Sequence, residues 1–332
     1  MLHRIAWVVV GVATIIGAVW LFGHYTGGPA RALELASQIT PARWLVVLAM
    51  TFVFYSLDWL RYFALFRLLG RPFPFALGMR LVAISYFVSS LTPSAELHLP
   101  VMVILLVERG YPAAEATAAT ITKSIYMVLW VIVFGLVGIE VAPSANVPAV
   151  IDDYLALWLV TPVAIAALLA FVVIAPSPIH RWCARRLAGS VAGWRRKLIE
   201  GLDKLPTAFA TIGRSRRGMH VVAHAACIAF VLVYVAIGHV VTTGVGVPVD
   251  ARTSFASYSV GLMVSYLAPV PGSIGVTEAA TAHLIDPSLG APAMTSAILT
   301  RTCTWYLAAL IGAVLLALEL RRIGWQRFVA RG

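Results

Sequence analysis

The sequence has little of the charge that a soluble protein carries on its surface. Only 12% of its 332 residues are charged, 61% are hydrophobic, and apolar runs use up most of the length. This balance excludes an ordinary soluble domain and indicates an all-α polytopic membrane protein. Acidic residues are the scarcer kind, with 14 against 25 basic ones and a net charge of +11. Because the basic residues flank apolar runs, we expect them to contact anionic lipid rather than nucleic acid.

Motifs for catalysis and for cofactor binding are also missing. There is no nucleophile elbow, no Walker loop and no zinc motif. The three cysteines, Cys183, Cys227 and Cys303, are odd in number and far apart, so they indicate neither a disulfide framework nor a metal site. His220 and His224 are one helical turn apart but lack a third ligand. The sequence therefore predicts no enzyme, no cofactor and no metal.

Hydropathy predicts one transmembrane domain over residues 1–332, with six full spans and two broken units. The broken units cover about 75–107 and 253–285. The first apolar run lacks a convincing small-x-small cleavage site, so we interpret it as a retained helix rather than a signal peptide. The predicted spans are 5–22, 44–66, 116–139, 154–174, 219–242 and 292–318.

Each broken unit is an apolar helix, a proline break, a lone glutamate and a second, short helix. Glycine, proline and charge are costly inside hydrophobic sequence, and breaks at corresponding positions in two halves point to a transport site. The first tip is predicted at Pro93 and Ser94, followed by Glu96 and His98. The second precedes Glu278 and contains Pro269, Pro271, Gly272, Ser273 and Gly275.

The distribution of positive charge predicts the orientation of the chain. Residues 176–217 contain ten basic residues and should be cytoplasmic, as should both termini, whereas the loop 140–153 has none and should lie outside. Each broken unit must then enter and leave on one side, as a re-entrant hairpin. The result is an inverted repeat, about 1–140 and 150–320, in a bacterial-type plasma (inner) membrane.

The basic segment 176–217 is also amphipathic. Its apolar residues recur in steps of three and four, which predicts a helix with one apolar face. A basic helix with tryptophan on its apolar side is typical of the membrane interface. The apolar residues are Leu187, Val191, Trp194, Leu198, Leu202, Leu205 and Phe209.

Four charged residues are candidates for binding substrate. Lys123 and Arg301 lie in the apolar runs that follow Glu96 and Glu278, roughly 10 and 14 Å below opposite surfaces. The hairpin tips should reach similar depths, so the four charges can converge and hold a phosphate, with help from the N-termini of the short helices. His98 beside Glu96 can relay protons, although a packed histidine explains it as well.

A structural interpretation of the same residues remains open. The glutamates fall in a first helical turn, where a carboxylate caps the backbone, and the two bases can simply neutralise them. We favour a role in binding because four buried charges cost more than uncharged caps would. Asp58 and Arg61 are interpreted as a structural i,i+3 pair, and Tyr126 and Trp305 as packing residues.

Residues 271–278 with Arg301 downstream resemble the P-G-G-x-G-x-x-E…R pattern of the lysylphosphatidylglycerol synthase transmembrane-domain family, the flippase-like membrane proteins. Residues 92–96 resemble that family's P-x-x-G-E segment. Ala95 and Ser273 stand where glycine is usual, and Leu99 where an arginine often follows. The resemblance implies an eight-segment domain that moves lipids between leaflets. We expect no fused soluble aminoacyltransferase domain.

These observations favour a lipid translocase that moves an anionic phospholipid or a polyprenyl-phosphate-type lipid through a central polar cavity. No ATPase motif is present, so movement should be downhill or ion-coupled. A secondary transporter of a small anionic solute is the alternative, and a lipid-modifying membrane enzyme comes third. The sequence leaves the oligomeric state open, a homo-oligomer included.

The orientation can be tested by single-cysteine labelling. On a background without native cysteines, Asn146→Cys should react with an impermeant reagent added outside intact cells. Ser190→Cys, in the basic segment, should react only after the cytoplasmic side is opened. Labelling of residue 146 from the cytoplasm alone would contradict the inverted arrangement.

Overall fold

The computed structural model describes Gly23 and residues 27–92, 98–142, 194–215, 217–268, 270–288 and 290–323, with side chains from residue 204 onward in the helix that begins at 194. Several predicted features lie outside these residues. They are the spans 5–22 and 154–174, the loop from 143 onward, most of the basic segment, and Pro93, Ser94, Glu96 and Pro269.

Every regular element in the described ranges is a helix, which confirms the all-helical membrane architecture. Four helices are long and apolar enough to cross a membrane. They coincide with the predicted spans 44–66, 116–139, 219–242 and 292–318. They are α3 (Pro41–Leu68), α6 (Ala113–Val141), α10 (Arg217–Gly244) and the helix formed by α13 (Ala291–Arg301) and α14 (Leu307–Ile323).

The remaining elements are shorter, and several have visible start signals. Asp250 caps α11, where it accepts a hydrogen bond from the Thr253 amide at 2.7 Å, and this bond holds the pKa of Asp250 below its ordinary value. Proline occupies the first turn of α2 and α5, where no amide donor is needed. The elements are α2 (Pro29–Ser37), α4 (Phe75–Ser90), α5 (Leu99–Glu108), α9 (Trp194–Arg214), α11 (Ala251–Leu267), the 3-10 turn η3 (Pro271–Ser273) and α12 (Val276–Ile285).

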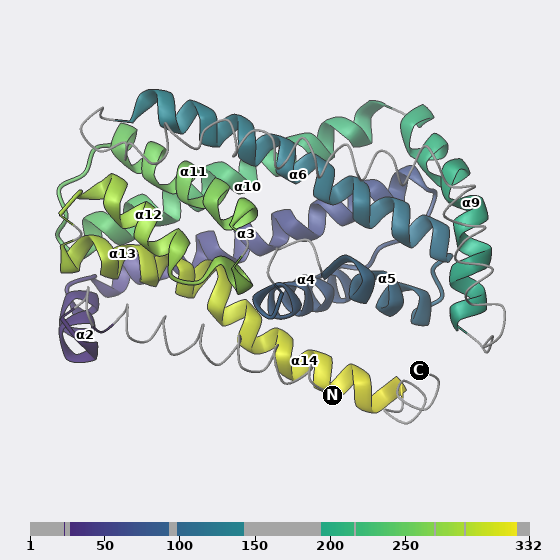
Figure 1. The fold of residues 1–332 in the computed structure, drawn as a ribbon, viewed down its shortest axis with the longest axis horizontal. Helices are drawn as coiled ribbons and strands as arrows, with labels where there is room; N and C mark the ends of the chain where they lie inside the picture. The colour runs from purple at the N-terminus through teal and green to yellow at the C-terminus, as the bar shows by residue number, and fades with distance from the viewer. Residues whose placement is uncertain are drawn as a thin grey trace.

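The two broken units approach from opposite ends of the bundle. In Figure 1 the long helices run across the view, with α9 at one end and α2 at the other. Helices α4 and α5 lie in the half nearer α9, whereas α11, α12 and α13 lie in the half nearer α2. Each unit therefore leaves toward the end from which it entered.

The tip of the second unit contacts the residues that follow α4 in the first unit. The Gly272 amide donates to the Thr92 carbonyl at 3.4 Å, across units far apart in sequence. Gly272 has a φ of 58°, and an added Cβ would lie 3.1 Å from the Ser90 Cα. Only glycine meets both the conformation and the close approach without strain. The sequence predicts both tips but not this contact.

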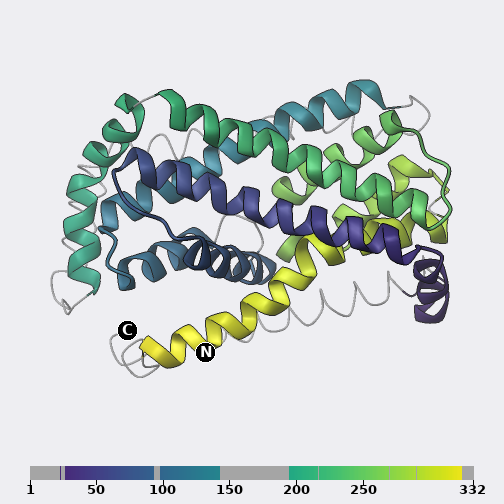
Figure 2. The ribbon, with the colours of Figure 1, turned by 180° about the vertical axis from the view of Figure 1, so that it is seen from behind.

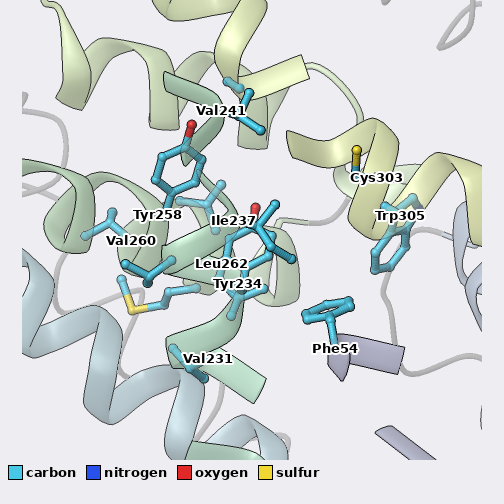
Figure 3. Close-up of a cluster of buried hydrophobic side chains, with 14 of the residues drawn as sticks. Phe54, Val231, Tyr234, Ile237, Val241, Tyr258, Val260, Leu262, Cys303 and Trp305 are labelled. Carbon is cyan, nitrogen blue, oxygen red and sulfur yellow. The ribbon is translucent and has the colours of Figure 1, made fainter. Parts of the chain in front are cut away.

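The core lies between the long helices. Helix α10 runs alongside α3 (Figure 2), and Phe54 stacks on Phe230 across that interface with ring centroids 4.0 Å apart. Figure 3 shows Trp305 and Tyr234 near Phe54, and Tyr258 lies beyond Tyr234, with centroids of the two tyrosines 6.0 Å apart. Helices α3, α10, α11 and the last span therefore all contribute side chains to one buried cluster.

Helix α9 confirms the predicted amphipathic helix, but the described part of its apolar face contacts protein rather than the membrane interface that the sequence predicted. The sequence assigns that face to the membrane interface. In the structure, Leu205, Ala208 and Ile212 are buried, and α9 packs across the end of α6 (Figure 1). Ser215 also donates to the Leu68 carbonyl at 3.0 Å. Hydropathy cannot distinguish a face that packs on protein from one that packs on lipid, because both are apolar.

Close helix contact is expected to limit substitution at Gly312, where α14 crosses α4. A Cβ on Gly312 would lie 2.0 Å from the Ala83 carbonyl oxygen, so the backbones must separate. Small residues permit such contact between membrane helices. Gly312→Ala should therefore destabilise the protein by about 1–3 kcal/mol. Thermal melts in detergent would measure this. Gly213→Ala is the control, because its Cβ would meet nothing within 4 Å. A Gly312→Ala variant that melts at the same temperature as the Gly213→Ala control would contradict the prediction.

Candidate functional site

The most highly charged part of the bundle interior is built on α3 and α6. Asp58 and Arg61 lie one turn apart on the same face of α3, with Asp58 Oδ1 2.7 Å from an Arg61 terminal nitrogen. Lys123 of α6 places its Nζ 2.7 Å from the same Asp58 oxygen. The three side chains are 2–6% exposed. One carboxylate oxygen is thus shared by two buried cations, an arrangement that offsets part of the large cost of removing each charge from water.

These three side chains line a cavity of about 40 Å³. Its wall is completed by both broken units, with Tyr86 and His98 from the first and Tyr266 from the second. A volume of this size accommodates roughly three water molecules. The remaining lining residues are Ser85, Ser89, Ser124, Met127 and Trp305.

His98 reaches the cavity from the turn before α5. Its Nδ1 lies 3.2 Å from the Ser89 hydroxyl at the end of α4, so the contact closes the first hairpin near its tip. The side chain is 8% exposed. Which of the two atoms donates depends on the histidine tautomer. The position suits either of the roles expected for His98, since it is both packed and adjacent to the charged group.

The second charged group is the pair of Glu278 and Arg301. Arg301 Nε donates to Glu278 at 3.2 Å, and its two terminal nitrogens donate to the Ser265 hydroxyl at 3.0 Å and to the Gly272 carbonyl at 2.6 Å. One guanidinium therefore binds the end of α11, the turn and the start of α12. Every nitrogen of Arg301 has an acceptor within the second hairpin.

Glu278 has its own partners at the same tip. Its Oε2 accepts from the Gly275 amide at 2.8 Å, which caps α12, and Tyr306 donates its hydroxyl to Oε1. The carboxylate is 3% exposed. This is the capping geometry of the structural interpretation, although a capped carboxylate can also line a transport path.

A π-helical turn connects the two charged groups. Residues 302–306, between α13 and α14, adopt this rare conformation, which is frequent at functional sites. The turn directs Trp305 so that its ring lies 4.8 Å from the Arg301 guanidinium while also lining the Asp58 cavity. The Cys303 carbonyl accepts from the Tyr55 hydroxyl at 2.7 Å. Nothing in the sequence signals this turn.

Three of the four charges predicted to converge lie in the described residues, where they form two separate ion pairs. Lys123 is paired with Asp58, and Arg301 with Glu278, while Glu96 lies outside the described residues. Asp58 and Arg61 do form the predicted i,i+3 pair. The interpretation of that pair as merely structural missed its place in the cavity wall. A signal was available, because an aspartate deep in an apolar run is costly unless it has a buried partner.

The two histidines of α10 contact aromatic residues of α6. The Tyr126 hydroxyl lies 2.9 Å from His220 Nδ1, and Trp130 donates to His224 Nδ1 at 3.0 Å. Tyr126 is therefore part of a polar interface as well as a packing residue. Among the residues that the structure describes, no group of three His, Cys, Asp or Glu side chains is placed to hold a metal.

Fold and site together define a multi-pass helical membrane protein with buried charge where two broken helices meet. The sequence matches the family described as Lysylphosphatidylglycerol synthase TM region over residues 8–312, and the chain belongs to that family. Membership makes it a membrane protein involved in lipid handling. Within the 332 residues no soluble domain is evident. No curated protein and no solved structure matched the chain.

The Glu278–Arg301 pair should contribute strongly to stability. Either Glu278→Gln or Arg301→Gln leaves a buried charge uncompensated, at a cost of about 3–5 kcal/mol, whereas the double variant removes both charges and should recover part of the loss. Melting temperatures of the three variants would measure the coupling.

The half-exposed pair of Arg71 and Glu115 provides the control. Neutralising it should cost only about 0–1 kcal/mol, because solvent screens the interaction. Single variants at Glu278 or Arg301 that cost no more than this control would contradict the role given to the buried pair.

Proposed function

We propose that the protein is a flippase-like lipid translocase, which moves an anionic phospholipid or a polyprenyl-phosphate-type lipid between leaflets. The observation that carries the proposal is the cavity in which Arg61 and Lys123 share the single carboxylate of Asp58. Both cations lie beside this buried cavity, where an anionic group could contact them. Charge-assisted hydrogen bonds to phosphate are strong in such surroundings.

The position of the cavity supports transport. It lies where hairpins from opposite ends of the bundle meet, and both contribute to its wall. With six spans and the orientation expected from positive charge, the hairpins become the two gates of an inverted repeat, with both termini in the cytoplasm. The hydrogen bond between Gly272 and Thr92 then closes the path between them.

Membership of a lipid-handling family favours a lipid over a solute. We infer that the headgroup phosphate enters the cavity while the acyl chains stay in the bilayer. A cavity of about 40 Å³ is small for a headgroup, so the tips must separate to admit it. The same small volume favours the second candidate function, secondary transport of a small inorganic anion.

The enzyme alternative rests on one contact, the hydroxyl–imidazole pair of Ser89 and His98. We propose that this pair only closes the first hairpin, because its contact joins the end of α4 to the turn before α5. Ser89→Ala should then leave lipid movement intact. Loss of a chemical modification of added lipid in that variant would favour the enzyme instead.

Lipid movement can be tested in proteoliposomes with fluorescent phosphatidylglycerol, as the fraction that an impermeant quencher reaches over time. The protein should accelerate its movement more than that of fluorescent phosphatidylcholine. Lys123→Gln should slow it roughly tenfold or more, because one charge-assisted contact of about 1.5–3 kcal/mol is lost. Asp58 keeps Arg61 as its partner in this variant, so the fold should survive.

Two further variants complete the test. Arg71→Gln removes an exposed cation away from the cavity and should move lipid at the wild-type rate. The double variant Glu278→Gln with Arg301→Gln asks whether the second pair also contacts substrate. Slow transport by a folded double variant would assign it that role. Wild-type transport by Lys123→Gln would contradict the proposed site.

A further inference from the structure

Two residues that line the cavity each carry a buried hydrogen-bond donor for which the described part of the chain provides no acceptor. The donors are Nε of Arg61 and the indole Nε1 of Trp305, from residues 2% and 9% exposed. Buried donors are nearly always paired in native structures, because an unpaired one forfeits its hydration. The donors come from α3 and from the π-helical turn, which are far apart in sequence but both contribute residues to the wall of this cavity.

The structure assigns these two donors to an oxyanion subsite, in which Trp305 is the residue that selects for a phosphate-type oxygen. This inference rests on the proposed function and deepens it, since it names the contact that recognises the anion. Lys123 and Arg61 attract negative charge of any shape. A neutral N–H makes binding depend on the orientation of the ligand, because its hydrogen bond is strong only when an acceptor oxygen lies in line with the N–H bond.

Trp305 is held in a way that suits this role. Its ring lies 4.8 Å from the Arg301 guanidinium on one side and meets Tyr86 of α4 edge-on, with centroids 4.9 Å apart, on the other. Both rings and the cation are buried or partly buried between the two hairpins. A side chain held by packing on both sides retains its orientation, which makes it a precise donor.

The ligand chemistry is a phosphate or phosphate ester with at least two accessible oxygens. One oxygen can accept from Arg61 Nε and another from Trp305 Nε1, with Lys123 providing charge. Such a group can belong to a lipid headgroup or to free phosphate. Free phosphate suits the cavity as it stands and a headgroup suits it once the tips separate, so the two probes decide between them.

The test is titration calorimetry on the full chain in detergent, with dihexanoyl phosphatidylglycerol and inorganic phosphate as probes. Trp305→Phe removes the N–H but keeps an aromatic ring beside Arg301 and Tyr86. It should weaken binding of the recognised probe roughly tenfold to a hundredfold, as expected for a lost hydrogen bond to a charged group. Its melting temperature should stay close to that of the wild type.

Trp59→Phe is the matched control. The Trp59 indole also lacks an acceptor, but Trp59 does not line the cavity. Its replacement should leave binding unchanged. If Trp305→Phe fails to fold, Arg61→Lys tests the same subsite, since it retains a cation for Asp58 while losing the Nε donor, and it should also weaken binding about tenfold.

Each outcome decides a separate question. Wild-type affinity in folded Trp305→Phe overturns the subsite and leaves lipid translocation standing. Trp305-dependent binding of the lipid probe without lipid movement in proteoliposomes supports the subsite and overturns the proposed function. Trp305-dependent binding of phosphate alone supports the subsite for a solute transporter. Absence of binding of either probe to the wild type overturns the subsite.

Discussion

Charge inside a membrane-spanning bundle must be compensated by near neighbours, because neither lipid nor packed protein can replace the water that has been removed. In this protein two groups of side chains compensate the buried charges. Asp58 Oδ1 lies 2.7 Å from both Arg61 and Lys123, which ties α3 to α6. Arg301 in turn binds three parts of the second hairpin. The first group therefore joins two long helices and lines the cavity, whereas the second holds the tip of the second hairpin together.

The division of partners between the groups has a functional meaning. Arg301 directs every nitrogen to an acceptor within its own hairpin, so in this conformation it stabilises the tip rather than offering a donor. Arg61 has an Nε for which none of the described residues is an acceptor. Both cations are buried, and Arg61 lines the cavity of about 40 Å³ whereas Arg301 is not among its described lining residues. Trp305 lies against both groups, so a movement at either one changes the environment of the other.

Much of the fold could be predicted from the sequence, because hydropathy, proline and charge act locally. Four of the predicted spans, the helices of both broken units and the described residues of the second tip correspond to elements of the structure. The pairing of Glu278 with Arg301 follows from the need to neutralise two charges in adjacent segments. The pairing of Asp58 with Lys123 does not, since it depends on how α3 and α6 are rotated about their axes. The contact between Gly272 and Thr92 is equally non-local, as it joins backbones of two separate units.

The π-helical turn at 302–306 also fixes the rotational phase of the last span. Such a turn inserts one residue into the helical repeat, which rotates everything beyond it by roughly 100° relative to an uninterrupted α-helix. Arg301 lies before the turn and faces the second hairpin, whereas Gly312 lies after it and packs on the backbone of α4. In a straight helix, eleven residues are close to three whole turns, and both residues would share one face. Because of the inserted residue, a single span directs Arg301 toward the second hairpin and the face that carries Gly312 toward the first.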